Sequence, residues 1–110
     1  MVMKKCESGD IKRFCLRVRA AMFSGDYEKC LEEICYGMYH YPHAPEPHNL
    51  MGILLEKQSN HLLAMKHFRA ALDLDPTYEP AKANIAAYAN FTTHGQEGVF
   101  TYDDCLELCR

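Results

Sequence analysis

The chain has 110 residues, 48% of them apolar and 25% charged, and its formal net charge is −3. This composition is typical of one small globular domain with a packed core, and it excludes an intrinsically disordered chain. The weak overall acidity gives no reason to expect nucleic acid or an anionic membrane as a partner. The charge is uneven, however, because the first twenty residues contain six basic and two acidic side chains. We interpret this stretch as a solvated basic helix, with one end of a binding surface as the alternative.

The cysteines and the N-terminal residues bear on the cellular compartment. No apolar run approaches the roughly 20 residues that a membrane-spanning helix needs. No apolar stretch follows Lys4 and Lys5, as it would in a secretory signal peptide. The cysteines include no Cys-x-x-Cys pair, and disulfides are rare in cytoplasmic proteins. We therefore expect a cytoplasmic protein with six reduced thiols, at Cys6, Cys15, Cys30, Cys35, Cys105 and Cys109.

Apolar periodicity predicts the first helix. Phe14, Val18 and Ala21 recur at the i, i+4, i+7 spacing that places side chains on one face of a helix. This pattern predicts a helix over 11–23. Asp10 is the expected N-cap, because its carboxylate can accept a hydrogen bond from a free backbone N–H group of the first turn.

Breaks in the chain mark where the other helices begin. Asp26 follows a serine and a glycine and can cap the second helix. Prolines at 42, 45 and 47 are tolerated only before or at the first turn of a helix, so they separate the second helix from the third. The last helix should start late, around 98–101, because two glycines precede it. No stretch alternates as a strand would. We therefore expect an all-α fold with helices over 11–23, 27–40, 46–57, 61–73, 79–91 and about 98–109.

Comparing the sequence with itself reveals an internal repeat. At an offset of 34 residues, small side chains fall on small ones, large apolar ones on large ones, and prolines coincide. The matched pairs are Asp26 with Asn60, Cys30 with Ala64, Ile34 with Phe68, Gly37 with Ala71 and Pro42 with Pro76, and a further shift brings Val18 and Gly52 onto Ala86. The pattern predicts a helix–turn–helix unit repeated nearly three times, in which Gly52, Ala64 and Ala71 lie where helix backbones approach closely.

The unit resembles the tetratricopeptide repeat (TPR). The middle unit has His48-x2-Met51-Gly52-x2-Leu55, then Ala64-x3-Phe68-x2-Ala71, then Pro76, which is similar to the family pattern except that His48 stands where tryptophan is favoured. The first unit departs at Arg17, where the family favours leucine, either because that helix is exposed at one end of the stack or because the register shifts toward Leu16. The resemblance implies an α-α superhelix of three helical hairpins in a single domain, with units at about 11–44, 45–78 and 79–110.

The resemblance also implies where a partner would bind. In this family the first helix of each unit lines a concave groove. The corresponding positions are Lys12, Cys15, Arg19 and Met22 in the first unit, Glu46, Asn49, Ile53 and Glu56 in the second, and Ala83, Asn84, Ala87 and Asn90 in the third. Among these we expect peptide contacts from Lys12, Arg19, Asn49, Ile53, Asn84 and Asn90. Asparagine amides can pair with a peptide backbone, and the two basic side chains can bind a carboxylate.

Some TPR proteins clamp the C-terminal carboxylate of a chaperone tail with basic and amide side chains on these helices. This chain has Cys15, Arg19, Pro80 and Asn84 at the corresponding places, so the clamp is not reproduced and that partner is disfavoured. We therefore expect a protein–protein interaction module, or adaptor, that binds a peptide or helix of another protein and has no catalytic activity.

Catalytic and metal sites are not expected. No glycine-rich phosphate loop is present. Cys30 and Cys105 occupy packing positions of the repeat, and His40, His43 and His48 are spread through a proline-rich loop, so we expect no metal and no cofactor. Two alternatives remain open. An apolar end of the stack near Phe100 and Leu106, if exposed, would favour homo-oligomers, and convergence of the three histidines or oxidation of the cysteines would favour a metal- or redox-responsive protein.

Overall fold

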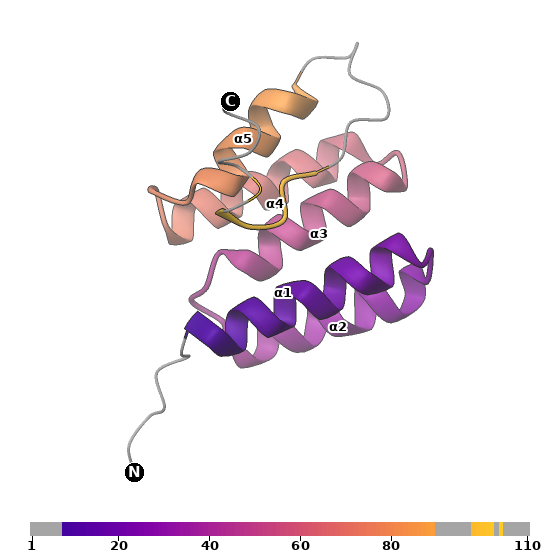
Figure 1. The fold of residues 1–110 in the computed structure, drawn as a ribbon. Coiled ribbons are helices and arrows are strands. Elements are labelled where there is room, and N and C mark those ends of the chain that lie inside the picture. Colours follow the sequence, from indigo (N-terminus) through magenta and orange to yellow (C-terminus); the bar gives the residue numbers. More distant parts are fainter. Residues whose placement is uncertain (1–7, 90–97, 103, 105–110) are drawn as a thin grey trace.

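Five α-helices follow one another in the computed structural model, which describes residues 8–89, 98–102 and 104 (Figure 1). Within these residues there is no β-strand. The fold is therefore all-helical, as the periodicity predicted. The helices are α1 (Ser8–Phe23), α2 (Tyr27–His40), α3 (Glu46–Lys57), α4 (His61–Leu74) and α5 (Glu79–Tyr88).

The first two helices form a hairpin around a tight turn. Asp26 caps α2 as expected, since its Oδ1 atom accepts a hydrogen bond of 3.1 Å from the backbone N–H of Lys29. Gly25 has a φ of +79°, which a residue without Cβ adopts at little cost. The expected N-cap at Asp10 is wrong. Because α1 begins at Ser8, Asp10 lies inside the first turn, where its negative charge still faces the positive end of the helix dipole.

The second hairpin contains the close helix approach at Gly52 that the repeat predicted. The expected bounds of α3 are confirmed, and α4 extends one residue beyond the prediction. A Cβ atom on Gly52 would lie only 2.6 Å from Cδ1 of Phe68, so the phenyl ring occupies the space that a side chain on α3 would need. Gly37 of α2 faces the ring of Phe14 of α1 in the same way. The repeat-pattern residues Gly52, Leu55, Ala64, Phe68 and Ala71 are buried, and Pro76 is exposed in the loop after α4.

The C-terminal part of the chain departs from the expected helices. α5 ends at Tyr88, and Asn90 and the residue after it lie outside the described residues. Gly98 to Phe100 are not helical. Thr101 and Asp104 then form a capping box, in which the Asp104 N–H donates to the Thr101 hydroxyl at 3.4 Å and the Thr101 N–H donates to the Asp104 carboxylate at 3.1 Å. Tyr102 and Asp104 have helical backbone, and the remainder of the predicted last helix lies outside the described residues.

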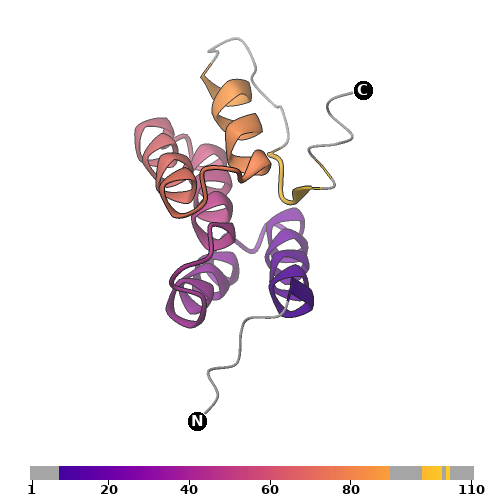
Figure 2. The ribbon, with the colours of Figure 1, turned by 90° about the vertical axis from the view of Figure 1, so that its left-hand side faces the viewer.

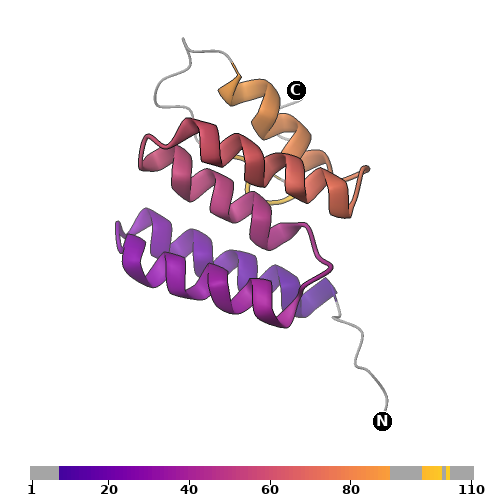
Figure 3. The same ribbon diagram turned by 180° about the vertical axis from the view of Figure 1, so that it is seen from behind.

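Each helix packs against the next, and α3 also contacts both α1 and α5 (Figures 1 and 2). In the view from behind, α2 and α4 lie in front of α1 and α3 (Figure 3). The arrangement therefore has two sides. α2 and α4 form one side, and α1, α3 and α5 face the other.

The two ends of this arrangement are less covered than its centre. Leu16 is 50% exposed on α1, and Arg17 is exposed beside it, so the first helix is an uncovered end and no register shift toward Leu16 occurs. Ala86 is also exposed, although its repeat equivalents Val18 and Gly52 are buried. Ala86 differs from them because no described helix follows α5 to cover this face as α4 covers α3. No helix among the described residues is both long enough and apolar enough to cross a membrane.

Candidate functional site

A segment from the C-terminal part of the chain lies across the side formed by α1, α3 and α5. We call residues 98–102 and 104 the covering segment. Figure 2 shows it between α5 and α1, with α3 standing between it and α4. Val99 and Phe100 are 1% and 2% exposed, so their side chains are buried among these helices. We call the space that the covering segment occupies between α1, α3 and α5 the groove.

Two asparagines bind the backbone of the covering segment. The Asn84 side chain accepts a hydrogen bond from the Val99 N–H at 2.7 Å and donates to the Val99 carbonyl at 2.9 Å. Asn49 donates to the same carbonyl at 2.8 Å and accepts a 2.7 Å bond from Asn84. Both asparagines are fully buried. Because a buried amide without partners is costly, these four bonds explain how two polar residues lie at the base of the groove.

An arginine and two aromatic rings form one end of the groove. The Arg19 guanidinium carbon lies 5.4 Å from the ring centroid of Phe23 and 5.3 Å from that of Phe100. The two rings are themselves 5.9 Å apart. The Arg19 Nη1 atom also lies 3.4 Å from Oδ1 of Asp104, in a partly exposed ion pair. Arg19 therefore binds both an aromatic side chain and a carboxylate of the covering segment.

A glycine seats the covering segment on α3. A Cβ atom on Gly98 would lie 2.7 Å from Cγ1 and 2.8 Å from Cγ2 of Ile53. Ile53 is fully buried and β-branched, so it has little freedom to move aside. A larger residue at position 98 would push the segment away from α3.

The other end of the groove contains polar groups held away from water. Burial raises the pKa of the Cys15 thiol to about 12, and the nearby Glu46 carboxylate adds to the increase. Burial likewise raises the pKa of Glu46 and the pKa of Tyr78. Oε1 of Glu46 is buried without a hydrogen-bond partner among the described residues. Little Cys15 thiolate is present at neutral pH, so Cys15 is unsuited to act as a nucleophile.

The structure brings together four of the six expected peptide-contact residues. Arg19, Asn49, Ile53 and Asn84 all contact the covering segment. Lys12 is exposed, and Asn90 lies outside the described residues. Asn49, Ile53 and Asn84 are fully buried because residues of the same chain cover them, so their contact with a peptide stays a prediction.

The remaining groove positions are mixed. Cys15 and Met22 are each 2% exposed and belong to the core. Glu56 forms a 2.7 Å contact with His61 of α4, and Ala83 and Ala87 are partly buried. Sequence reasoning missed Phe23, Phe100 and Asp104. The Thr-x-x-Asp spacing at 101–104 was the available signal that the chain is ordered there.

The histidines do not form the metal site that one alternative required. Among the described residues, no group of three or more His, Cys, Asp or Glu side chains is arranged to hold a metal ion. His48 instead approaches His67, with 3.2 Å between their Nδ1 atoms and nearly parallel rings. One of these nitrogens must carry the proton and the other must accept it. Burial lowers the pKa of both imidazoles, which favours this neutral pair.

The described cysteines agree with the expectation of free thiols. Cys15, Cys30 and Cys35 form no disulfide. Cys30 is fully buried at the predicted packing position, and burial raises its pKa to about 11. Cys6, Cys105 and Cys109 lie outside the described residues.

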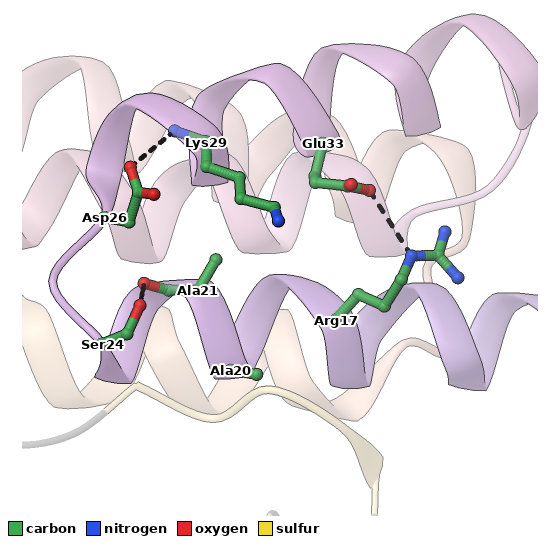
Figure 4. A pocket seen from close by; sticks show the side chains of 7 residues that line it. All are labelled: Arg17, Ala20, Ala21, Ser24, Asp26, Lys29 and Glu33. Atoms are coloured by element: carbon green, nitrogen blue, oxygen red, sulfur yellow. Dashed lines mark hydrogen bonds and ion pairs between the residues drawn. The ribbon is translucent and has the colours of Figure 1, made fainter.

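A second, more open depression lies between α1 and α2 (Figure 4). It has a volume of about 400 Å³. Arg17 pairs with Glu33 across it at 3.5 Å, and Asp26 caps the backbone of α2 at Lys29. The depression contains both basic and acidic side chains, and surface ion pairs such as Arg17–Glu33 contribute little to the free energy of folding. This depression lacks the buried polar groups of the groove between α1, α3 and α5. Its lining residues are Arg17, Ala20, Ala21, Ser24, Asp26, Lys29 and Glu33.

Comparisons with known proteins provide no assignment. No protein-family model, no curated protein and no solved structure matches this chain. A functional assignment therefore depends on the groove itself and on the residues that hold the covering segment.

Proposed function

We propose that this chain is a small TPR-type interaction module that binds an extended segment of a partner protein in the groove between α1, α3 and α5. The module supplies binding and no chemistry. The observation that carries the proposal is the pairing of Asn84 and Asn49 with the backbone of Val99. Bonds to a backbone N–H and C=O do not depend on the side chain of the bound residue, so the same amides can hold another extended chain.

The groove also offers selectivity at one end. Arg19 contacts a phenyl ring and a carboxylate at the same time. Lys12 lies two turns earlier on the same helix and is exposed. We infer that the preferred partner segment carries an aromatic and an acidic residue. Their attraction to α1 should weaken with salt, because exposed charges are screened beyond a Debye length of about 8 Å at physiological ionic strength.

A random-peptide display selection against the full chain tests this function. Enriched peptides should be acidic and should bind more weakly at high salt. The double reversal Lys12→Glu with Arg19→Glu should weaken their binding about tenfold or more, since a contact to a charged group contributes roughly 1.5–3 kcal/mol. Arg13→Glu is the matched control, because Arg13 is an exposed residue of the same helix. Peptides that bind all three proteins equally would place the binding surface elsewhere.

Self-assembly is the weaker candidate. Phe100, which would favour it if exposed, is 2% exposed, and Leu106 lies outside the described residues. Leu16 and Phe23 are half-exposed on α1, and Leu31 and Tyr36 are exposed on α2. Exposed apolar side chains are common on the surface of monomeric proteins and do not by themselves indicate an interface. We therefore place the partner site in the groove.

A further inference from the structure

The covering segment contacts the groove through the groups that a bound peptide would use. Its Val99 backbone is paired with Asn49 and Asn84, its Phe100 ring lies beside Arg19, and its Asp104 carboxylate binds the same arginine. Three different helices supply these contacts. Apolar side chains would fill a core without the loss of hydration that buried amides suffer. Hydrogen bonds made by buried amides add little net stability beyond that loss.

We propose that the covering segment is an internal ligand, and that the partner of the groove is an extended segment with the same chemistry. That chemistry is a small residue, an aliphatic residue and an aromatic residue in succession, followed by a carboxylate four positions after the aromatic, as in Gly98, Val99, Phe100 and Asp104. Binding of the partner requires the covering segment to leave. This inference rests on the proposed function, because it names the ligand class and the regulation of the same groove.

Each position of this pattern has a structural reason. The small residue is required because any Cβ atom at position 98 would overlap Ile53. The aliphatic residue is 1% exposed and presents the backbone groups that the asparagines bind. The aromatic ring fits against Phe23 and Arg19. The carboxylate binds Arg19 and also accepts the N–H of Thr101, so its distance from the aromatic residue is set by one helical turn.

The internal ligand sets how tightly an outside segment can bind. Only eight residues separate Ala89 from Gly98, so the covering segment is held near the groove at a high effective concentration. A partner can bind only the molecules whose groove is empty. Its apparent affinity is therefore its affinity for the empty groove multiplied by the fraction of empty molecules. Weakening the covering segment without altering the helices should therefore tighten the binding of an outside peptide.

A fluorescent peptide that copies residues 98–104, with an acetylated N-terminus, tests the proposal. It is titrated against the full wild-type chain, against Gly98→Val, in which the new side chain meets Ile53, and against Gly9→Val. A Cβ atom at Gly9 would meet no atom of the described residues within 4 Å, so this position serves as the matched control. The Gly98→Val protein should bind the peptide about tenfold or more tightly than the other two, because more of its grooves are empty. A Gly98→Val protein that keeps its helical circular dichroism and binds no peptide would overturn the proposal.

A charge exchange shows whether the peptide occupies the same groove. A peptide with arginine in place of Asp104 should lose binding to the Gly98→Val protein and regain it when Arg19→Asp is added.

Should Gly98→Val fail to fold, hydrogen exchange in the wild-type chain gives an independent test. Saturating peptide should speed exchange of the Val99 N–H, because its partner Asn84 is then taken by the peptide. Unchanged Val99 exchange under saturating peptide would contradict displacement.

The outcomes separate this inference from the proposed function. If display-selected peptides bind in an Arg19-dependent way but the copy of residues 98–104 does not bind, the module function stands and the internal-ligand inference fails. If the copy binds the Gly98→Val protein but no display-selected peptide binds in an Arg19-dependent way, the covering segment is exchangeable and the proposed external partner fails. Light scattering would show whether the wild-type chain forms dimers that the peptide dissociates into monomers. Such dimers would mean that a second copy of the chain occupies the groove, and they would overturn the proposal of an external partner.

Discussion

The Asn84 side chain binds both backbone groups of Val99, accepting from its N–H at 2.7 Å and donating to its carbonyl at 2.9 Å. An amide that pairs in this way satisfies an extended residue much as a neighbouring β-strand would. Both residues are buried, and Asn84 is the partner of the Val99 N–H. This pair connects the stability of the chain to the occupancy of the groove.

Replacing Asn84 should therefore destabilise the protein. Asn84→Leu leaves the Val99 N–H and the Asn49 Oδ1 atom without partners, and we expect the free energy of unfolding to fall by about 1–3 kcal/mol. Asn60→Leu is the control, since Asn60 is exposed and makes no side-chain bond at the start of α4. Its effect should stay within about 0.5 kcal/mol. Urea denaturation measures both, and equal midpoints would show that the Asn84 bonds carry no stability.

Because α3 and α4 approach closely at Gly52, a larger side chain there should destabilise the protein. Gly52→Leu would overlap the Phe68 ring, and overpacking of this kind typically costs about 1–3 kcal/mol. Gly9→Leu adds the same side chain at a place where none of the described residues lies within 4 Å, so it should be neutral or slightly stabilising. Thermal and denaturant unfolding of the two variants can be compared directly. A Gly52→Leu protein as stable as the wild type would mean that the helices can separate freely at this point.

The thiols should differ in reactivity by their burial. Among the described thiols, the exposed Cys35 should be alkylated before Cys15 and Cys30, which should react slowly in the native state. Their burial raises the pKa of Cys15 to about 12 and that of Cys30 to about 11, so little thiolate is present at neutral pH. Peptide-level mass spectrometry after timed alkylation gives each rate. We also expect six free thiols under denaturing conditions, and a melting temperature that responds to reductant would count against this.

The His48–His67 pair should make the protein less stable in mild acid. Burial lowers the pKa of both imidazoles below the ordinary value of 6.5, so the unfolded chain binds more protons than the folded one near that pH. Their contribution to stability is therefore fully present above pH 6.5 and is lost as the pH falls below it. His67→Phe keeps an aromatic ring and removes one titrating group. Its unfolding free energy should vary less with pH between neutral and mildly acidic solution than that of the wild type.

Glu46 should have the opposite pH dependence. Burial raises its pKa above the ordinary value of 4.5, so the folded state holds the proton more tightly than the unfolded chain. Its favourable contribution is fully present below pH 4.5 and is lost as the pH rises through the folded pKa. Glu46→Gln should therefore raise the melting temperature at pH 7 and lose this advantage in acid. Glu32→Gln, at an exposed position of α2, should leave the melting temperature nearly unchanged at both values.

Much of the helical framework could be predicted from the sequence. The bounds of α2 and α3 match their predicted ranges, and the Asp26 cap forms as expected. These features are local, because a cap, a proline or an i, i+4 apolar pair acts within one or two turns. The small residue at Gly52 was also informative, since its recurrence indicated a close helix approach before its neighbour Phe68 was known.

Other features were decided only by the tertiary structure. Asn49 and Asn84 are polar and resemble surface residues in a sequence, yet both are fully buried because Val99 pairs with them. Gly98 and Ile53 meet across 45 positions of the chain, and no local pattern connects them. Helices can be inferred from bonds between residues three or four apart. The occupancy of the groove depends instead on which distant backbone satisfies two buried amides, and that is settled only when the whole chain packs.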